Sequence, residues 1–160
     1  MQFTFTFTTT AEDVFERVTD AGFIEARCLA LGSLQAQCQS DDAPLPLIII
    51  HRTEAAELPA IMKKVVGNQQ KIQTEEQWSE TEESYDSRSL TKVVGTPIEI
   101  HATQCLYNLE SGSEITVDLT VSAKIPLIGK KIEPMVASKV RTEMLKEFDY
   151  VNSTLASTLA

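Results

Sequence analysis

Residues 115–159 (ITVDLTVSAKIPLIGKKIEPMVASKVRTEMLKEFDYVNSTLASTL) decide the fold, because their hydrophobic period changes midway. Over 115–123, apolar residues alternate with Thr, Asp and Ser, which indicates a β-strand with one buried face. Over 132–159 the apolar residues follow a helical period, which predicts a long amphipathic helix. Pro134 suits the first turn of this helix or a kink, so its start stays open. The expected buried stripe is Ile132, Met135, Val136, Val140, Met144, Phe148, Val151, Leu155 and Leu159, and the charged residues Lys139, Arg141, Lys146, Glu147 and Asp149 are expected mostly on other faces.

The residues before this segment predict one further strand, two short helices and then more strands. Residues 1–10 (MQFTFTFTTT) alternate Phe with Thr, which is typical of a strand. Thr10 resembles the N-cap of a helix that ends by Asp20, and a second helix is expected over 23–31. Residues 58–67 (LPAIMKKVVG) form an apolar and basic connection between strands. The remaining strands are expected over 33–40, 45–53, 70–79, 85–94 and 98–109.

This order of elements predicts an α+β domain in which an antiparallel sheet packs on the terminal helix. Consecutive strands joined by short turns form an antiparallel meander, here of seven strands. A strongly curved sheet needs an element on its concave side, and only the terminal helix is long enough to fill it. We therefore expect residues 1–160 to form a single domain in which a curved antiparallel sheet wraps the terminal helix. The two short helices lie between the first and second strands.

Five segments carry a resemblance to a known fold family: FTFTF at 3–7, AEDVF at 11–15, LPAIMKKVVG at 58–67, EEQW at 75–78 and IPLIGKKIE at 125–133. With the order of elements, they resemble the START-like helix-grip superfamily, also called SRPBCC, which includes the Bet v 1-like fold of the birch-pollen allergen. Within it, the chain looks like a bacterial branch, domain-of-unknown-function family 2505. The resemblance implies a helix-grip fold with a hydrophobic cavity between the sheet and the terminal helix. Many relatives hold lipids, sterols, polyketides or quinones there, a minority are cyclases or other enzymes, and some are co-chaperones.

The composition excludes several classes of protein. The chain has 160 residues with 14 basic and 23 acidic side chains, a net charge of −9, which disfavours general binding to nucleic acid. Its longest apolar run, LPLIII at 45–50, is far shorter than the roughly 20 residues of a transmembrane helix. The N-terminus lacks the features of a signal peptide. Cys28, Cys38 and Cys105 have no CxxC spacing, so we expect reduced, mostly buried thiols and a cytoplasmic protein.

The strand pattern also predicts which side chains face the cavity. If Trp78 points inward, Glu76 shares its face, because side chains alternate along a strand. A carboxylate in an apolar site has a raised pKa and can act as an acid–base group, so Glu76 is the leading catalytic candidate, with His51 as a second. His101 is expected on the solvent face. Two histidines without matching Cys spacing predict no metal site, and no cofactor is expected. The expected ligand-binding residues are Ile49, Trp78, Ile100, Gln104, Leu119, Met135, Val136, Val140 and Met144.

The meander places apolar, lysine-bearing connections at one end of the sheet, because alternate strands run in the same direction. The opposite end is expected to carry the acidic turn around Glu80–Asp86, so the molecule should be electrically polarised. An apolar rim with lysines at a cavity mouth suits transient docking on an anionic membrane surface. It equally suits a rim that caps the barrel and carries solubilising lysines. The expected portal residues are Met62, Lys63, Lys64, Val65, Val66, Leu127, Ile128, Lys130 and Lys131.

Three functions follow from this sequence. The leading one is non-covalent binding, and carriage, of a hydrophobic or amphipathic small molecule such as a lipid in the cavity beneath the terminal helix. The first alternative is an enzyme of the cyclase or hydratase kind that uses an inward Glu or His. The second alternative is a co-chaperone-like module for protein interaction, in which the chain's own side chains fill the cavity. The fold alone does not choose among the three.

Overall fold

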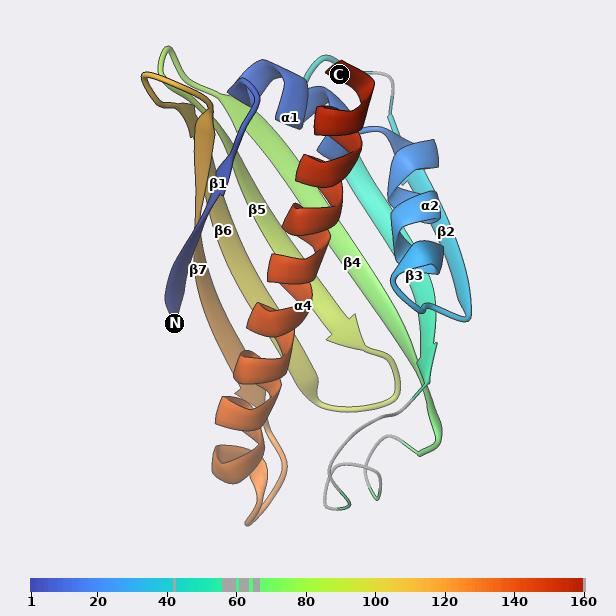
Figure 1. Cartoon of the computed structure of the whole chain (residues 1–160). Helices are drawn as coiled ribbons and strands as arrows, with labels where there is room; N and C mark the ends of the chain where they lie inside the picture. Colours follow the sequence, from blue (N-terminus) through green and yellow to red (C-terminus); the bar gives the residue numbers. More distant parts are fainter. Residues whose placement is uncertain (42, 56–59, 61–63, 65–66, 160) are drawn as a thin grey trace.

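The computed structural model describes residues 1–41, 43–55, 60, 64 and 67–159. Figure 1 shows a long helix, α4, lying across a strongly twisted sheet. In chain order the elements are β1 (Gln2–Phe7), α1 (Ala11–Val18), α2 (Ala21–Ala30), β2 (Gln35–Ser40), β3 (Leu47–Ala55), β4 (Gln69–Glu80), β5 (Ser84–Val93), β6 (Ile98–Asn108), β7 (Ser113–Ala123) and α4 (Gly129–Leu159).

The strands of the described residues form one antiparallel sheet in the order β1-β7-β6-β5-β4-β3-β2. The first strand, β1, therefore pairs with the last strand, β7, and Phe5 lies opposite Ile115. Strands β2 to β7 pair in chain order as a meander. The predicted helix-grip architecture is confirmed, including the two short helices between β1 and β2. Thr10 caps α1 through a hydrogen bond from the amide of Asp13 (3.2 Å), and Asp20 caps α2 through the amide of Phe23 (2.7 Å).

Helix α4 begins earlier than its apolar stripe suggests. Gly129 is its first residue, and a Cβ at that position would collide with the carbonyl oxygen of Ala123, so the close approach requires glycine. Glu133 then accepts a hydrogen bond from the amide of Ala123 (3.1 Å), which ties the helix to the end of β7. Pro134 consequently lies beyond the first turn, inside the helix, so of the two predicted alternatives the place in the first turn is wrong.

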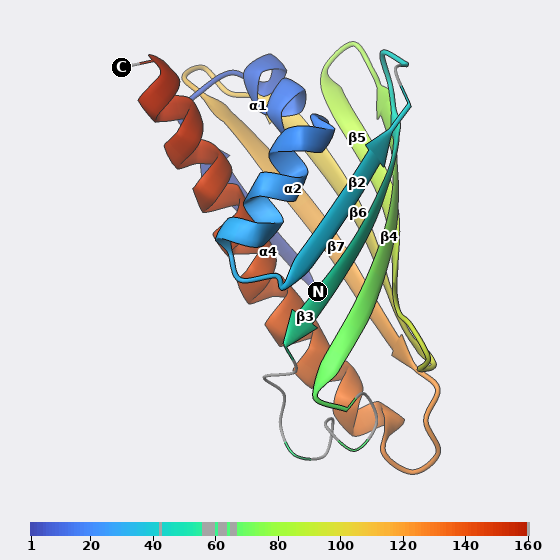
Figure 2. The same cartoon turned by 90° about the vertical axis from the view of Figure 1, so that its right-hand side faces the viewer.

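Helix α4 covers the concave face of the sheet, with α1 and α2 beside it, as Figure 2 shows. Alternation places Phe3 and Phe7 of β1 inward, and the same period gives β7 its buried Ile115, Val117 and Leu119. The interior is therefore a single core between helix and sheet. The fully or nearly fully buried side chains that α4 contributes to it are Ile132, Val136, Phe148, Val151 and Leu155.

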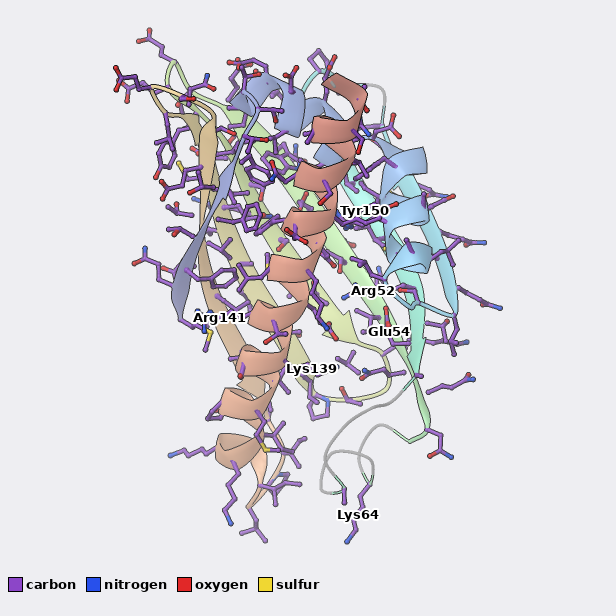
Figure 3. The ribbon with its side chains drawn as sticks, in the orientation of Figure 1. Arg52, Glu54, Lys64, Lys139, Arg141 and Tyr150 are labelled. Carbon is purple, nitrogen blue, oxygen red and sulfur yellow. The ribbon has the colours of Figure 1, made fainter. Side chains whose placement is uncertain are left out.

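The two ends of the sheet differ in chemistry as expected. The acidic end carries α1, the C-terminus of α4 and the β4–β5 turn, which includes Glu82 and Glu83 (Figure 1). The opposite end, here called the lysine end, carries the β5–β6 turn and the β7–α4 loop at 124–128. Lys64 also lies at the lysine end (Figure 3). The two ends therefore present opposite charges to an approaching surface.

Candidate functional site

A cavity of about 100 Å³ lies between α4 and the concave face of the sheet. Typical sites for drug-sized ligands occupy about 300–1,000 Å³, so this cavity admits a small molecule or one segment of a larger one. Its wall combines apolar side chains with an unusual number of charged ones. The residues that line it are Arg27, Cys28, Ile50, Arg52, Thr74, Glu76, Ser89, Thr91, Ile100, Ala102, Gln104, Leu119, Val140, Glu143, Met144 and Glu147.

Two arginines and one glutamate bring three elements together at the cavity. Glu147 of α4 lies 3.7 Å from an amino nitrogen of Arg27 on α2 and 3.5 Å from an amino nitrogen of Arg52 on β3. Arg52 also approaches Glu54, with 3.6 Å between its Nε and the carboxylate (Figure 3). These separations are longer than the 2.7–2.9 Å of a good charge-assisted hydrogen bond. The side chains of Arg27 and Glu147 are only 11% and 19% exposed, so the pair is largely withdrawn from water.

The guanidinium groups are not fully satisfied by the protein. Within the part of the chain that the structure describes, no group accepts a hydrogen bond from the buried Nε of Arg27 or of Arg52. A buried donor without an acceptor costs roughly 1–3 kcal/mol, and more for a charged group. Each of the two buried guanidinium groups therefore keeps one N–H that the described residues leave unpaired.

Glu76 enters the same cavity from β4. Its carboxylate accepts a hydrogen bond from the indole Nε1 of Trp78 (2.6 Å) and another from the amide of Gln104 (3.2 Å). Gln104 also donates to the hydroxyl of Ser87 (3.0 Å). Burial raises the pKa of Glu76, and the hydrogen bonds from Trp78 and Gln104, with the charge of Arg27, only partly offset it. A fraction of this carboxyl is thus protonated at a pH where exposed glutamates are ionised.

The predicted ligand residues divide into three groups. Five of them line the cavity, and Val136 lines a smaller neighbouring cavity of about 50 Å³. Trp78 and Met135 pack in the core without lining the main cavity. Ile49 is a wrong prediction, because alternation turns Ile48 and Ile50 inward and leaves Ile49 on the outer face. The five that line the main cavity are Ile100, Gln104, Leu119, Val140 and Met144.

Of the two catalytic candidates, one faces the cavity and the other is exposed to solvent. Glu76 faces the cavity, as the alternation with Trp78 predicts. His51 is exposed, so its assignment as an inward acid–base group is wrong. The neighbouring Arg52 takes the inward position instead, on the same face as Ile48 and Ile50. His101 is exposed as expected and lies 3.5 Å from Glu99.

Sequence reasoning also missed Arg27 and Glu147. Arg27 is only 9% exposed although it is charged, and it follows the buried face of α2 that Ile24 and Cys28 define. Glu147 was expected mainly away from the apolar stripe of α4, but it turns toward the cavity. Arg27 and Glu147 are 120 residues apart in the chain, and each is stabilised inside the protein by the opposite charge of the other. Local periodicity carries no signal for a pair of such distant residues.

The portal residues are only partly covered by the structure. Met62, Lys63, Val65 and Val66 lie outside the described residues. Lys64, Lys130 and Lys131 are exposed at the lysine end, and Ile128 packs partly against the core. Leu127 is 99% exposed and has a positive φ of 70°, a conformation that costs a leucine roughly 1–2 kcal/mol. The tip of the β7–α4 loop therefore holds an apolar side chain in solvent.

None of the helices that the structure describes is long and apolar enough to cross a bilayer. The described residues also contain no group of three or more His, Cys, Asp or Glu side chains arranged to hold a metal ion.

The fold is similar to that of START-like, Bet v 1-like helix-grip proteins. A START superfamily protein from Mycobacterium smegmatis superposes with a TM-score of 0.63 over 100% of this chain and 98% of that chain, at 15% identity. The protein TTHA0849 of Thermus thermophilus gives a TM-score of 0.70 over 100% and 99%, at 11% identity. Ara h 8.0201 gives 0.60 over 98% and 97%, at 12% identity. At these identities the likeness is one of fold.

The family follows from the sequence itself. A model of the family described as "Protein of unknown function (DUF2505)" matches residues 2–155, and the chain belongs to this family. An uncharacterized protein of Mycobacterium bovis, Mb0491c, is 22% identical over 103 residues, which are 62% of this chain and 59% of that protein. The uncharacterized protein Rv0481c of Mycobacterium tuberculosis matches with the same figures. The chain thus spans about three fifths of the length of these curated relatives.

Proposed function

We propose that this protein binds a small hydrophobic or amphipathic molecule in the cavity between α4 and the sheet. The observation that carries the proposal is the cavity itself, where Ile50, Ile100, Leu119 and Met144 supply apolar wall. Burial of a guest against this wall contributes about 25 cal/mol per Å² of apolar surface. The charged and amide groups at one side of the cavity orient the guest. The START-like fold is compatible with this use.

The size of the cavity limits the guest. An apolar protein cavity of about 150 Å³ accommodates benzene, and the cavity here is about 100 Å³. A long-chain lipid therefore requires α4 to move away from the sheet, and a guest of about six carbons requires a smaller widening of the cavity. Native mass spectrometry of the freshly purified protein tests the proposal. A reproducible adduct that is lost on denaturation supports it, and binding of neither natural adducts nor small apolar probes contradicts it.

We further propose that the lysine end docks transiently on anionic membranes and serves as the route to the cavity. The exposed Leu127 supplies an apolar side chain for insertion, and Lys64, Lys130 and Lys131 supply charge of about 1 kcal/mol each near an anionic surface. Flotation with anionic and neutral vesicles tests this idea. Leu127→Glu should abolish binding to anionic vesicles, whereas Leu109→Glu at the acidic end should not.

Lysine substitution provides the second arm of the flotation test. Replacing Lys63, Lys64, Lys130 and Lys131 together by Gln should remove the preference for anionic vesicles, because the charge that attracts the protein is gone. Retention of full binding by this variant contradicts the docking proposal. It leaves the cavity proposal untouched, since no residue of the cavity wall is altered.

A second candidate function is acid–base catalysis by Glu76, favoured by its position in the cavity and the raised pKa of its carboxyl. Such a group could donate or remove a proton on a bound guest, as a cyclase or hydratase requires. Once a guest is identified, Glu76→Gln should abolish its turnover while leaving its affinity within a few-fold. Unchanged turnover in this variant excludes the catalytic role.

A further inference from the structure

We infer that the guest of the cavity beneath α4 carries an uncharged hydroxyl group, which forms hydrogen bonds with the carboxyl group of Glu76 and with the hydroxyl of Ser89. The inference rests on the proposed function and names the chemical class of the guest, a small alcohol with an apolar tail. Its basis is the place of these two residues on neighbouring strands, where both line the cavity.

Glu76 and Ser89 are neighbours on the concave face of the sheet. Glu76 of β4 lies directly opposite Ser89 of β5, and Ser89 lies directly opposite Ala102 of β6. The Cβ atoms of directly opposite residues are about 4.5–5.5 Å apart, and their side chains project from the same face. All three residues line the main cavity. Because Ser89 and Ala102 are small, they leave room for a guest beside the side chain of Glu76.

The carboxyl group of Glu76 reaches over strand β5, which carries Ser89. It accepts a hydrogen bond from Nε2 of Gln104 on β6 (3.2 Å), two strands away, and another from the indole Nε1 of Trp78 (2.6 Å). Each carboxyl oxygen thus accepts one hydrogen bond and keeps acceptor capacity, since an ionised carboxyl group offers about four lone-pair sites. Glu76 is half-buried and lines the cavity, so its side chain keeps surface that a guest can contact.

The hydroxyl of Ser89 has no hydrogen-bond partner within the described part of the chain. Its oxygen is nevertheless not one of the enclosed polar atoms that lack a partner, and Ser89 is half-buried and lines the cavity, so the hydroxyl is open to a guest. The next inward residue of β5 differs, because Ser87 is 2% exposed and accepts a hydrogen bond from Gln104 (3.0 Å). Ser89 therefore supplies the accessible hydroxyl beside Glu76.

The charges of the wall favour a guest without a net charge. Arg27 and Arg52 share Glu147 at 3.7 and 3.5 Å, and Glu143 forms an ion pair with Lys139 (2.8 Å). A guest ammonium would meet the two arginines, and a guest carboxylate would meet the glutamates. Either ion would also lose its hydration on entering the cavity. An uncharged polar group avoids both costs.

A hydroxyl group matches Glu76 and Ser89 because it donates and accepts hydrogen bonds at once. It donates to Glu76 when that carboxyl is ionised and accepts from it when the carboxyl is protonated, and Ser89 supplies the second hydrogen bond in either case. The other uncharged groups of the wall compete little, since the hydroxyls of Thr74 and Thr91 bond to each other (2.9 Å) and the thiol of Cys28 is a weak donor. A guest without a hydroxyl forfeits both hydrogen bonds.

Four six-carbon probes separate the possibilities by titration at pH 7.5. They are 1-hexanol, hexylammonium, hexanoate, and 1-fluorohexane, which has the shape of the alcohol but carries a weakly hydrogen-bonding fluorine in place of the hydroxyl. Ser89→Ala removes the hydroxyl from the wall. Ser122→Ala, on the outer face of β7, is the matched control.

We expect 1-hexanol to bind at least fivefold more tightly than 1-fluorohexane and than either charged probe. Ser89→Ala should weaken the alcohol about tenfold, the equivalent of one hydrogen bond, and leave the fluoride within twofold. Ser122→Ala should change neither.

The unsubstituted protein supplies a second measurement that needs no variant to fold. Trp78 is the only tryptophan of the chain, so its indole Nε1–H gives a single NMR signal. Because this N–H donates to the carboxyl group of Glu76, its signal should shift further at saturation with 1-hexanol than with 1-fluorohexane.

Three results overturn the inference. They are binding of 1-fluorohexane or of a charged probe as tight as that of 1-hexanol, equal loss of alcohol and fluoride affinity in Ser89→Ala, and equal shifts of the indole signal with both neutral probes. Binding of 1-fluorohexane with any of these leaves the proposed function standing, because the fluoride tests the apolar wall alone. Failure of all four probes to bind overturns both the inference and the proposed function.

Discussion

The two halves of the interior use the same sheet and the same helix but are packed differently. Toward the acidic end, aromatic rings interlock: Phe15 stacks on Tyr85 (4.2 Å between centroids) and meets Trp78 edge-on (5.4 Å). Phe7 contacts Phe148 at 5.9 Å. In the middle of the sheet, charged and amide side chains take the place of rings, and a cavity remains. The comparison teaches that the interior is filled where aromatic rings meet and stays hollow where charged and amide side chains line it.

The largest effect is expected from truncation in the aromatic half. Phe7→Ala should lower the free energy of unfolding by about 4 kcal/mol, because Phe7 is 1% exposed and its removal leaves a void. Met144→Ala, at the cavity wall, should cost about half as much, since Met144 already borders empty space. Urea denaturation measures both. Equal losses would show that the two halves are packed alike.

A smaller loss is expected when the charge network of the cavity is broken. Glu147→Gln should destabilise the protein by roughly 3 kcal/mol, because it leaves Arg27 and Arg52 without their shared carboxylate in a largely buried place. Glu143→Gln removes a helical pair with Lys139 that is more exposed, and should cost less than about 1 kcal/mol. Similar stabilities of the two variants would mean that Glu147 is effectively solvated.

The pH dependence of stability tests whether Glu76 is buried as described. Its folded pKa is raised above the value of about 4.5 for an unperturbed glutamate, so the folded state binds more protons than the unfolded state between the two values. Stability should therefore fall as the pH rises from about 4.5 through the folded pKa, and stay level above it. Arg27 and Glu147 act on this carboxyl with opposite signs.

The matched variants for this titration are Glu76→Gln and Glu75→Gln. Glu76→Gln should remove the fall, because an amide does not titrate, whereas the exposed Glu75 on the outer face should leave it unchanged when replaced. Thermal unfolding measured from pH 4 to pH 8 gives the three profiles. A fall that persists in Glu76→Gln would assign it to another group.

The smallest change in stability is expected from filling the cavity. Ala102 lines it and is 6% exposed, so Ala102→Val adds volume where space exists and should change stability by less than about 1.5 kcal/mol. The same variant should weaken binding of a small apolar probe such as 2-hexanone strongly, because the added methyl groups occupy the site of the guest. Ala156→Val, at an exposed position near the end of α4, is the control for binding. Unaltered affinity in Ala102→Val would place the guest elsewhere.

The sequence predicts most of the fold because a strand or helix that buries one face repeats its apolar residues at a regular spacing. The alternation of β1 and β7 and the stripe of α4 follow directly from which faces meet the core. The site is less predictable. In LPLIII, apolar residues occupy both faces, so the pattern could not show that Ile48 and Ile50 point inward, and it put Ile49 and His51 there instead of Arg52.

The charged part of the site is hidden from the sequence for a different reason. Arg27 and Glu147 are stabilised inside by each other, and that contact exists only after α2 and α4 have docked on the sheet. Gln104 and Glu76 were predicted to face inward because regular strands carry them. Side chains whose direction depends on backbone alternation can thus be predicted, and those that depend on a distant partner cannot.

A crystal structure of the protein soaked with 2-hexanone tests the central claim most directly. The account predicts electron density for the ketone between α4 and the sheet, with its alkyl chain against Leu119 and Met144. Density confined to the outer surface, with the space beneath α4 closed and empty at saturating ketone, would contradict it.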